Sequence, residues 1–199
     1  MILNVEHITK TFGKNQVLKG VSFEMGKQSL YGVVGENGSG KSTLLKIIVG
    51  EWKPDGGRVS VNGQLGYCPQ ETSLFSHLTV DEHFRYFAAA YGIERTTWPS
   101  RAESLLNDFN FKKYHHTQVA HLSGGTQQKL NLALALLHQP NLLILDEHYN
   151  GFDWDTYLRF WNYANRLRKE GCAILVVTHL ITEKKRFDKI FNLNQGLLQ

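Results

Sequence analysis

Short apolar stretches separated by polar turns open the chain, and their spacing predicts β-strands. Ile2 to Glu6 alternates apolar and polar residues as an edge strand does, and Lys10 to Asn15 is a turn cluster. Val17 to Met25 follows as a second strand pattern, and Leu30 to Val34 is a short, β-prone apolar run. The start of the chain is therefore expected to be mainly β.

Two further strand patterns flank an Asn-Gly pair. Arg58 to Val61 and Leu65 to Cys68 lie on either side of Asn62-Gly63, and this dipeptide favours the backbone of a two-residue hairpin turn. The pattern predicts that these two strands pair with each other in an antiparallel hairpin.

The pattern changes to helical spacing between residues 72 and 122. Thr79 followed three residues later by Glu82 is a capping box, and the helix that it starts is expected to run from Val80 to Tyr91. A second helix is expected over about Arg101 to Phe109. No strand pattern is evident in this stretch, so it is expected to be helical.

The last part of the chain alternates helices with continuous apolar runs. Helices are expected from Leu122 to Leu137 and from Asp155 to Glu170. Leu142 to Leu145 and Ala173 to Val177 are apolar throughout, which is typical of parallel strands buried on both faces. A short closing hairpin is expected from the strand patterns Lys189 to Leu193 and Gly196 to Leu198.

Together these patterns define an α/β fold in one domain, residues 1–199. It combines a mainly parallel core sheet with an antiparallel β subdomain and a helical subdomain inserted at about 72–137. A chain of this length buries a sizeable core without disulfides, and Cys68 and Cys172 are expected to be free thiols in a reducing cytoplasm. No apolar run approaches the roughly 20 residues that span a bilayer, and the N-terminus resembles a strand rather than a signal peptide.

The net charge of +4 at pH 7 is spread along the chain. The densest basic run, Lys184-Lys185-Arg186, is too short to indicate nucleic-acid binding and is expected to be a solvated surface. No nucleic-acid partner is therefore expected.

One motif carries specific chemistry, because it lies between a strand pattern and a helix pattern. Residues 35–43 fit G-x-x-x-x-G-K-[ST], the loop that binds the phosphates of a nucleoside triphosphate. Glycines let backbone N–H groups approach a phosphate, Lys41 adds positive charge toward the β- and γ-phosphates, and Ser42 offers a hydroxyl to Mg²⁺. The candidate binding residues are Gly35, Glu36, Asn37, Gly38, Ser39, Gly40, Lys41, Ser42 and Thr43.

Polar residues follow two of the buried strand patterns at their carboxyl ends, where ligands of α/β sheets bind. Asp146 and Glu147 follow Leu142 to Leu145; Asp146 suits a Mg²⁺ ion, and Glu147 suits a base that deprotonates water. His179 follows the last buried strand and is expected to contact the γ-phosphate and that water. The structural alternatives are an acidic strand-end cap and a histidine that only packs.

Three further candidates lie in loops. Ser123-Gly124-Gly125 precedes a helix and forms either a second phosphate site or simply a helix cap. Because it lies far along the chain from the first loop, it is expected to serve a nucleotide on another copy. Gln70 follows a strand and could ligate Mg²⁺, and Phe12 could stack on a base or belong to the core.

Taken in order, these motifs resemble those of the nucleotide-binding domain of ABC transporters, and the resemblance covers essentially the whole chain. Phe12 matches the loop that stacks on adenine, residues 35–43 match Walker A, and Gln70 matches the Q-loop. The remaining matches are 122–127 with the family signature, 142–147 with Walker B and its catalytic glutamate, 151–153 with the D-loop, and His179 with the switch histidine.

The resemblance implies a P-loop ATPase that uses ATP and Mg²⁺ and works as a dimer, with a second copy or a related chain. Two subunits would close head to tail, each ATP lying between one subunit's phosphate loop and the other's Ser123 to Gly125. A separate transmembrane permease would dock near Gln70 and the helical insert. The chain would then be cytoplasmic and peripheral, at the inner face of a membrane.

The resemblance also assigns roles. Glu147 would act as base while Lys41 and His179 stabilise the charge of the transferred phosphate. The metal would be held by Ser42, Gln70 and Asp146.

Three departures from the family pattern stand out. Thr126 replaces a usual Gln in the signature, His148-Tyr149-Asn150 replaces Pro and two small residues, and Phe12 replaces a usual Tyr.

The segments 66–70 and 78–83 look most like those of exporter subunits. The alternatives are a soluble ABC-type ATPase acting on ribosomes, nucleic acid or a protein assembly, and a regulatory module without turnover, against which Glu147 and His179 argue.

Overall fold

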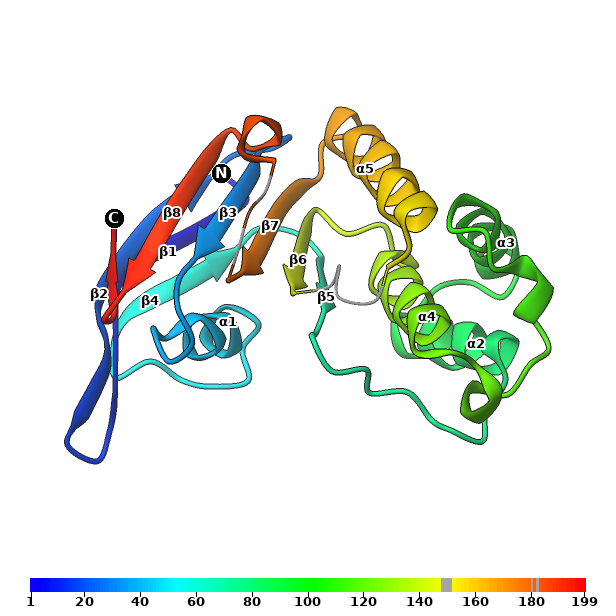
Figure 1. Ribbon diagram of the computed structural model, residues 1–199, viewed down its shortest axis with the longest axis horizontal. Helices are drawn as coiled ribbons and strands as arrows, with labels where there is room; N and C mark the ends of the chain where they lie inside the picture. The colour runs from blue at the N-terminus through cyan, green and yellow to red at the C-terminus, as the bar shows by residue number, and fades with distance from the viewer. Residues whose placement is uncertain (148–151, 180, 182) are drawn as a thin grey trace.

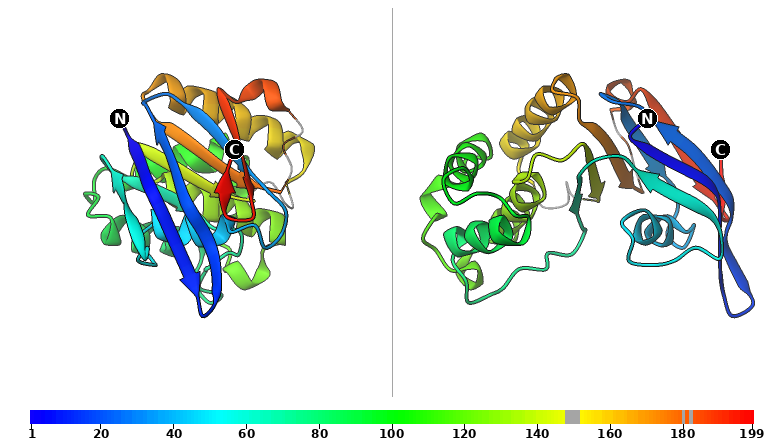
Figure 2. Two further views of the ribbon diagram at one scale, coloured as in Figure 1. Left: turned by 90° about the vertical axis from the view of Figure 1, so that its left-hand side faces the viewer. Right: turned by 180° about the vertical axis from the view of Figure 1, so that it is seen from behind.

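The computed structural model describes residues 1–147, 152–179, 181 and 183–199. Figure 1 shows one lobe built of strands around helix α1 and a second lobe built of helices, with both chain ends on the strand lobe. The same division is visible from behind in Figure 2.

Two sheets form within the described residues. An antiparallel sheet has the order β2-β1-β4, from β1 (Leu3–Phe12), β2 (Asn15–Met25) and β4 (Gly56–Val61). The second sheet has the order β5-β6-β7-β3-β8-β9, and its neighbours are parallel except for β9. Its strands are β3 (Leu30–Val34), β5 (Leu65–Cys68), β6 (Leu142–Asp146), β7 (Ala173–Thr178), β8 (Lys189–Asn194) and β9 (Leu197–Leu198).

The helices lie on opposite sides of the six-stranded sheet. The helix that follows β3, α1 (Lys41–Ile48), packs between the two sheets. The helical lobe contains α2 (Val80–Ala90), α3 (Trp98–Asp108), α4 (Gly124–Leu136) and α5 (Trp154–Lys169). Short 3₁₀ turns cover Lys112–Tyr114, Val119–His121 and Lys184–Arg186.

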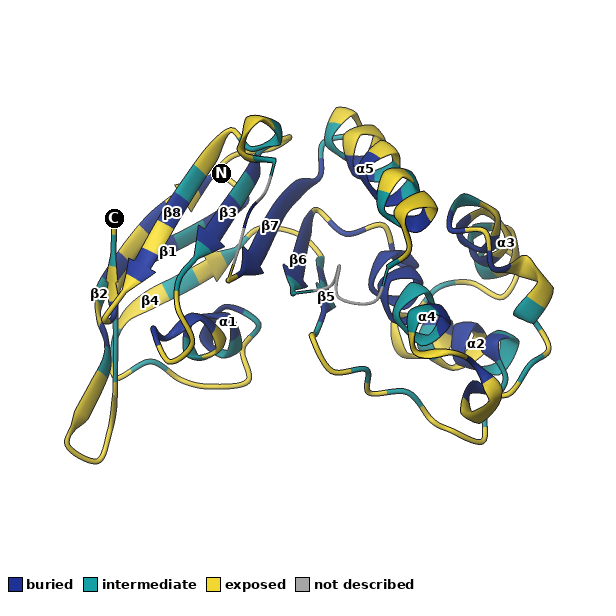
Figure 3. Cartoon of the chain, viewed as in Figure 1, coloured by how far each residue is buried: buried dark blue, intermediate teal, exposed yellow. Residues whose placement is uncertain are grey.

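The apolar runs of the sequence become strands shared by two hydrophobic cores. In β6, Leu142 and Ile144 pack into the core around α1, whereas Leu143 and Leu145 pack into the core of the helical lobe. All four are 0% exposed, and Figure 3 shows β6 and β7 buried along most of their length. Burial on both faces explains why these strands are continuous apolar runs rather than alternating patterns.

Most predicted elements are confirmed, but the Asn62-Gly63 hairpin is wrong. Instead of pairing with each other, β4 pairs with β1 in one sheet, and β5 pairs in parallel with β6 in the other. The turn at Gly63 carries the chain between the sheets, and a Cβ there would collide with the Asn141 side chain. Because the Asn141 Oδ1 accepts the Gln64 N–H at 2.8 Å, the turn is fixed by a distant residue that local sequence does not indicate.

The first strand is also longer than predicted. The turn cluster expected at Lys10 to Asn15 shrinks to Gly13-Lys14, because β1 pairs with β2 as far as Phe12 opposite Asn15. An irregularity in the pairing lies near His7, which has a φ of 48°. The boundaries of the helical subdomain, about 72–137, remain a prediction.

A buried histidine secures the loop that enters the helical lobe. His83 on α2 is 0% exposed, and its Nε2 accepts the Phe75 N–H at 3.0 Å while Nδ1 lies 2.9 Å from the Thr79 carbonyl oxygen. Only the neutral ring with its proton on Nδ1 satisfies both contacts. Burial lowers the pKa of His83, although the Thr79 carbonyl and Glu82 oppose this.

The two contacts of the neutral His83 ring predict that the fold becomes less stable in acid. Because the unfolded chain binds a proton at His83 near pH 6.5 more readily than the folded chain, this residue makes stability fall as pH drops below that value. As the pH falls from about 7.5 to about 5.5, we expect the free energy of unfolding to decrease less in His83→Gln than in the wild type. Urea unfolding across this range tests the expectation, and parallel curves for the two proteins would contradict it.

Candidate nucleotide-binding site

The phosphate loop, Asp146, Glu147 and His179 meet at one edge of the six-stranded sheet. The loop follows β3, the carboxylates end β6, and His179 follows β7, and these three strands are neighbours in the order β6-β7-β3. Their carboxyl ends line a cavity of about 380 Å³. Ten of its lining residues were predicted from the sequence: Asn37, Gly38, Gly40, Lys41, Ser42, Thr43, Gln70, Asp146, Glu147 and His179.

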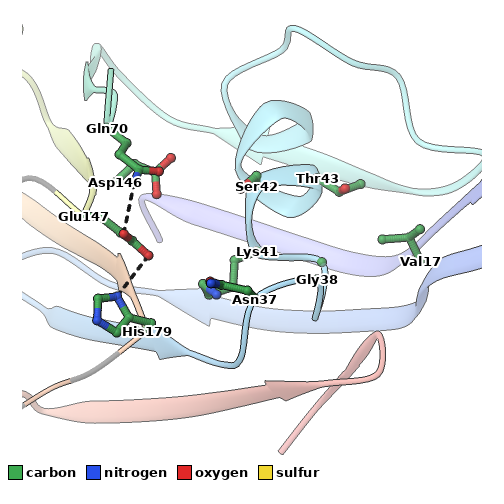
Figure 4. Close-up of a pocket in the computed structure, with 11 residues that line it drawn as sticks. Val17, Asn37, Gly38, Lys41, Ser42, Thr43, Gln70, Asp146, Glu147 and His179 are labelled. Atoms are coloured by element: carbon green, nitrogen blue, oxygen red, sulfur yellow. Dashed lines mark hydrogen bonds and ion pairs between the residues drawn. The ribbon is translucent and has the colours of Figure 1, made fainter. Parts of the chain in front are cut away.

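Figure 4 shows these side chains around the cavity, together with Val17 from β2. Nothing in the local sequence distinguishes Val17 from a core valine, so sequence reasoning missed it. Gly35 and Glu36 line a neighbouring cavity that also includes His179.

Close packing and unusual backbone angles shape the phosphate loop. Gly38 and Gly40 have φ values of 83° and 107°, a region that side-chain-bearing residues rarely adopt. A Cβ on Gly35 would collide with the Leu193 carbonyl oxygen on β8. Helix α1 begins directly after Gly40, so its free N–H groups point toward the loop and favour an anion there.

Lys41 is held in the middle of this loop. Its ammonium donates to the Gly35 carbonyl at 2.7 Å and to the Glu36 carbonyl at 3.0 Å. The residue is only 8% exposed. A buried ammonium at a helix N-terminus is the kind of positive site that favours a phosphate.

The two carboxylates at the end of β6 differ in environment. Burial, and next the nearby charge of Glu147, raise the pKa of Asp146 to about 6, although Lys41 opposes this. A carboxylate that is disfavoured by burial is well placed to bind a cation, which restores its charged form. Glu147 has a φ of 45°, a strained value for a residue with a side chain.

The Glu147 carboxylate lies between two other predicted residues. Its Oε2 accepts the Gln70 side-chain N–H at 3.2 Å, and its Oε1 lies 3.3 Å from the His179 Nδ1. The dashed lines in Figure 4 mark both contacts. The arrangement joins the ends of β5, β6 and β7 through side chains and places a mostly buried carboxylate in the lining of the cavity.

The donor atoms fit a magnesium ion. Ser42, Gln70 and Asp146 each offer an oxygen within the lining of the same cavity, and oxygen ligands are what Mg²⁺ prefers. Among the described residues, no group of three His, Cys, Asp or Glu side chains could hold a metal by itself. This is expected, since Mg²⁺ at nucleotide sites binds one or two protein groups together with phosphates.

Phe12 and the Ser123–Gly125 segment, both predicted to contact a nucleotide, do not line this cavity. Phe12, near the tip of the β1–β2 hairpin, is 44% exposed and meets the Trp52 ring edge-on at a centroid distance of 5.3 Å. Ser123 caps α4 by accepting the Thr126 N–H at 3.3 Å. Gly124, beside it, is exposed.

The Ser123–Gly125 segment therefore has the helix-cap role that its sequence left open, and it remains accessible at a helix N-terminus. The departure at His148-Tyr149-Asn150, and Gly151 of the predicted D-loop, lie outside the described residues. Asp153, which follows them, caps α5 by accepting the Thr156 N–H at 2.7 Å.

The fold and this site define a P-loop nucleoside-triphosphate-binding protein. Comparison with known proteins narrows the class, because a family model described as "ABC transporter" matches residues 18–150. A solved structure described as the ATP binding subunit of an ABC transporter superposes with a TM-score of 0.94 at 30% identity, over 100% of this chain and 88% of that one. The chain therefore belongs to the ABC transporter family and is an ATP-binding domain of it, a Mg²⁺-dependent ATPase.

Relatives differ in how much of their length this domain covers. The chain is 32% identical to the ABC-type transporter ATP-binding protein EcsA of Bacillus subtilis, over 98% of this chain and 84% of that protein. It is 30% identical to the probable multidrug ABC transporter ATP-binding protein YbhF of Escherichia coli, over 99% of this chain and 36% of that protein. It spans 28% of the ABC transporter G family member 20 of Dictyostelium discoideum, at 30% identity over 98% of this chain.

Proposed function

We propose that this chain hydrolyses ATP to drive transport across a membrane through a separate membrane-spanning subunit. The observation that carries the proposal is the Glu147 carboxylate, held between Gln70 and His179 beside the phosphate loop. A regulatory module without turnover has no need of such a carboxylate. The alternative of an ATPase acting on ribosomes or nucleic acid gains no support from relatives that are named as transporter components.

The residues divide the chemistry among them. Lys41 and the loop N–H groups bind the β- and γ-phosphates, and Glu147 accepts the proton of the attacking water. His179 stabilises the charge on the γ-phosphate. Ser42, Gln70 and Asp146 would hold Mg²⁺, which would neutralise phosphate charge.

Base stacking completes the site for ATP. Phe12 contributes its exposed face to the adenine, supported by its contact with Trp52. Gly35, Glu36, Asn37 and Ser39 shape the loop around the phosphates.

A membrane subunit fits a row of four aromatic side chains after Gln70, of which Phe87 is partly buried and the others are exposed. Phe75, Tyr86, Phe87 and Tyr91, which we call the aromatic strip, contact one another at centroid distances of 5.2 to 5.9 Å. Phe75 and Tyr86 are 47% and 53% exposed, and clustered exposed aromatic residues mark interaction surfaces. Within the described residues, no helix is long and apolar enough to cross a bilayer.

The direction of transport is proposed from a relative. YbhF is named as a probable multidrug transporter component, which supports export as the process that this chain drives. The chain then lies at the cytoplasmic face of the membrane, with the helical subdomain at 72–137 carrying the docking surface. Affinity purification from membranes, followed by identification of the bound membrane protein, tests the proposal, and copurification with ribosomes instead would overturn it.

The working unit proposed here is a dimer, of two copies or of this chain and a related ATPase. Ser123, Gly124 and Gly125 lie at the N-terminus of α4, an anion-binding position, but they do not line the cavity of their own phosphate loop. They are therefore available to the γ-phosphate of an ATP on another subunit.

Ser123→Arg should block this contact. The long cationic side chain fills the space before α4, so we expect ATP to bind the single chain normally while ATP-driven dimerisation is lost. Light scattering with ATP in the absence of Mg²⁺ measures the dimer. If the variant still dimerises as the wild type does, the second phosphate site is not Ser123 to Gly125.

A further inference from the structure

Side chains from α4 and the turn after it cover the open edge of β5. Within the described part of the chain, this strand lies at the end of its sheet and pairs only with β6. The His138 Nε2 lies 3.0 Å from the Leu65 carbonyl oxygen, Asn131 donates to the Pro69 carbonyl at 3.1 Å, and Gln128 donates to the Gln70 carbonyl at 3.0 Å. Carbonyl groups of an edge strand and its exit loop are therefore bonded by α4 and by the turn that follows it.

The side-chain amides of Gln128 and Asn131 are expected to lower the stability of α4. Asn131 is 8% exposed, and asparagine is a poor residue for a helix interior. The Gln128 Oε1 is buried without a hydrogen-bond partner in the described structure. The flanking Leu130 and Leu132 are fully buried, so an apolar side chain would suit this helix better if packing were the only requirement.

The two amides bind the backbone at Gln70, whose side chain reaches Glu147, and at Pro69 directly before it. Gln70 is held by its carbonyl oxygen to Gln128, and its side chain donates to the Glu147 Oε2 at 3.2 Å. Gln128 and Asn131 are three residues apart, so they share one face of α4. That face thus fixes the backbone from which the Gln70 side chain extends.

We propose that Gln128 and Asn131 are positioning residues, which set the place of the Gln70 side chain against Glu147 and the metal. This inference rests on the role proposed above for Gln70. It adds that α4, which begins at Ser123 to Gly125, is connected to the hydrolytic site of its own chain through Gln128. An altered tilt of α4 would move Gln70 relative to Glu147.

The proposal is tested by removing the Gln128 side-chain N–H group that donates to the Gln70 carbonyl. For Gln128→Ala in the full chain, we expect kcat to fall about three- to tenfold, as for the loss of one positioning hydrogen bond, with the KM for ATP within about twofold. Gln128→Glu keeps the size of the side chain but removes the donor, and it should show the same loss. Gln64→Ala, which changes an exposed glutamine before β5, is the matched control and should keep its turnover.

Two measurements separate positioning from a general loss of structure. Hydrogen exchange of the peptide covering residues 66–74 should be faster in Gln128→Ala than in Gln64→Ala, with equal thermal unfolding. In a Gln70→Ala background, adding Gln128→Ala should cause no further loss of kcat.

The outcomes are distinguishable. Unchanged kcat and exchange in a folded Gln128→Ala protein would overturn the inference while leaving the proposed role of Gln70 intact. If Gln128→Ala lowers kcat by the same factor in the wild type and in the Gln70→Ala background, the inference is also overturned, because the Gln70 side chain would then not be needed for the effect on kcat. If Gln70→Ala itself keeps the wild-type kcat, the proposed role of Gln70 fails, and this inference with it.

Discussion

Replacing Glu147 with glutamine is expected to slow ATP hydrolysis by about 10²–10⁴-fold, the usual effect of losing a positioned base. Glutamine has the same length and can still bond to Gln70 and His179, but it cannot accept a proton from water. ATP binding should survive, because the phosphate loop is unchanged. Phosphate release under single-turnover conditions, with nucleotide affinity measured in parallel, checks both parts.

A matched control is available next to Gln70. Glu71→Gln removes an exposed carboxylate that does not line the cavity, and it should hydrolyse ATP as the wild type does. Near-normal turnover in Glu147→Gln would mean that Glu147 is not the base.

Lys41→Ala is expected to weaken ATP binding itself by at least about tenfold, which is 1.4 kcal/mol. The substitution removes a buried positive charge directed at the phosphates and leaves the Gly35 and Glu36 carbonyls without their present donor. A charged hydrogen bond to a phosphate contributes more than a neutral one. Isothermal titration calorimetry of the folded variant measures the loss.

Lys46→Ala serves as the control for a lysine on the same helix. Its ammonium lies 4.6 Å from the centre of the Trp52 ring and does not line the cavity. An unchanged affinity for ATP in Lys41→Ala would refute the phosphate-binding role of Lys41.

Much of the site could be predicted because most of its residues lie in short motifs that directly follow strand patterns. The alternation of strand and helix patterns places residues 35–43, Asp146, Glu147 and His179 after strands, and parallel strands bring their carboxyl ends to one edge. Gln70 was suggestive only through its place in the motif order. The structure adds its contact with Glu147.

The parts that could not be predicted depend on contacts between distant segments. The strands at 58–61 and 65–68 separate because Asn141, far along the chain, fixes the turn between them. Val17, Gln128 and Asn131 have no local signal, since their roles come from what packs beside them. The backbone strain at Glu147 is likewise absent from the sequence pattern.

That strain carries a consequence for protein engineering. A glutamate with left-handed backbone angles costs about 1 kcal/mol, which glycine would largely avoid. A search for heat-resistant variants would therefore favour glycine or asparagine at position 147 and would collect inactive proteins. On the role proposed above for Glu147, the chain gives up this stability in order to place a carboxylate in the cavity, where it serves activity.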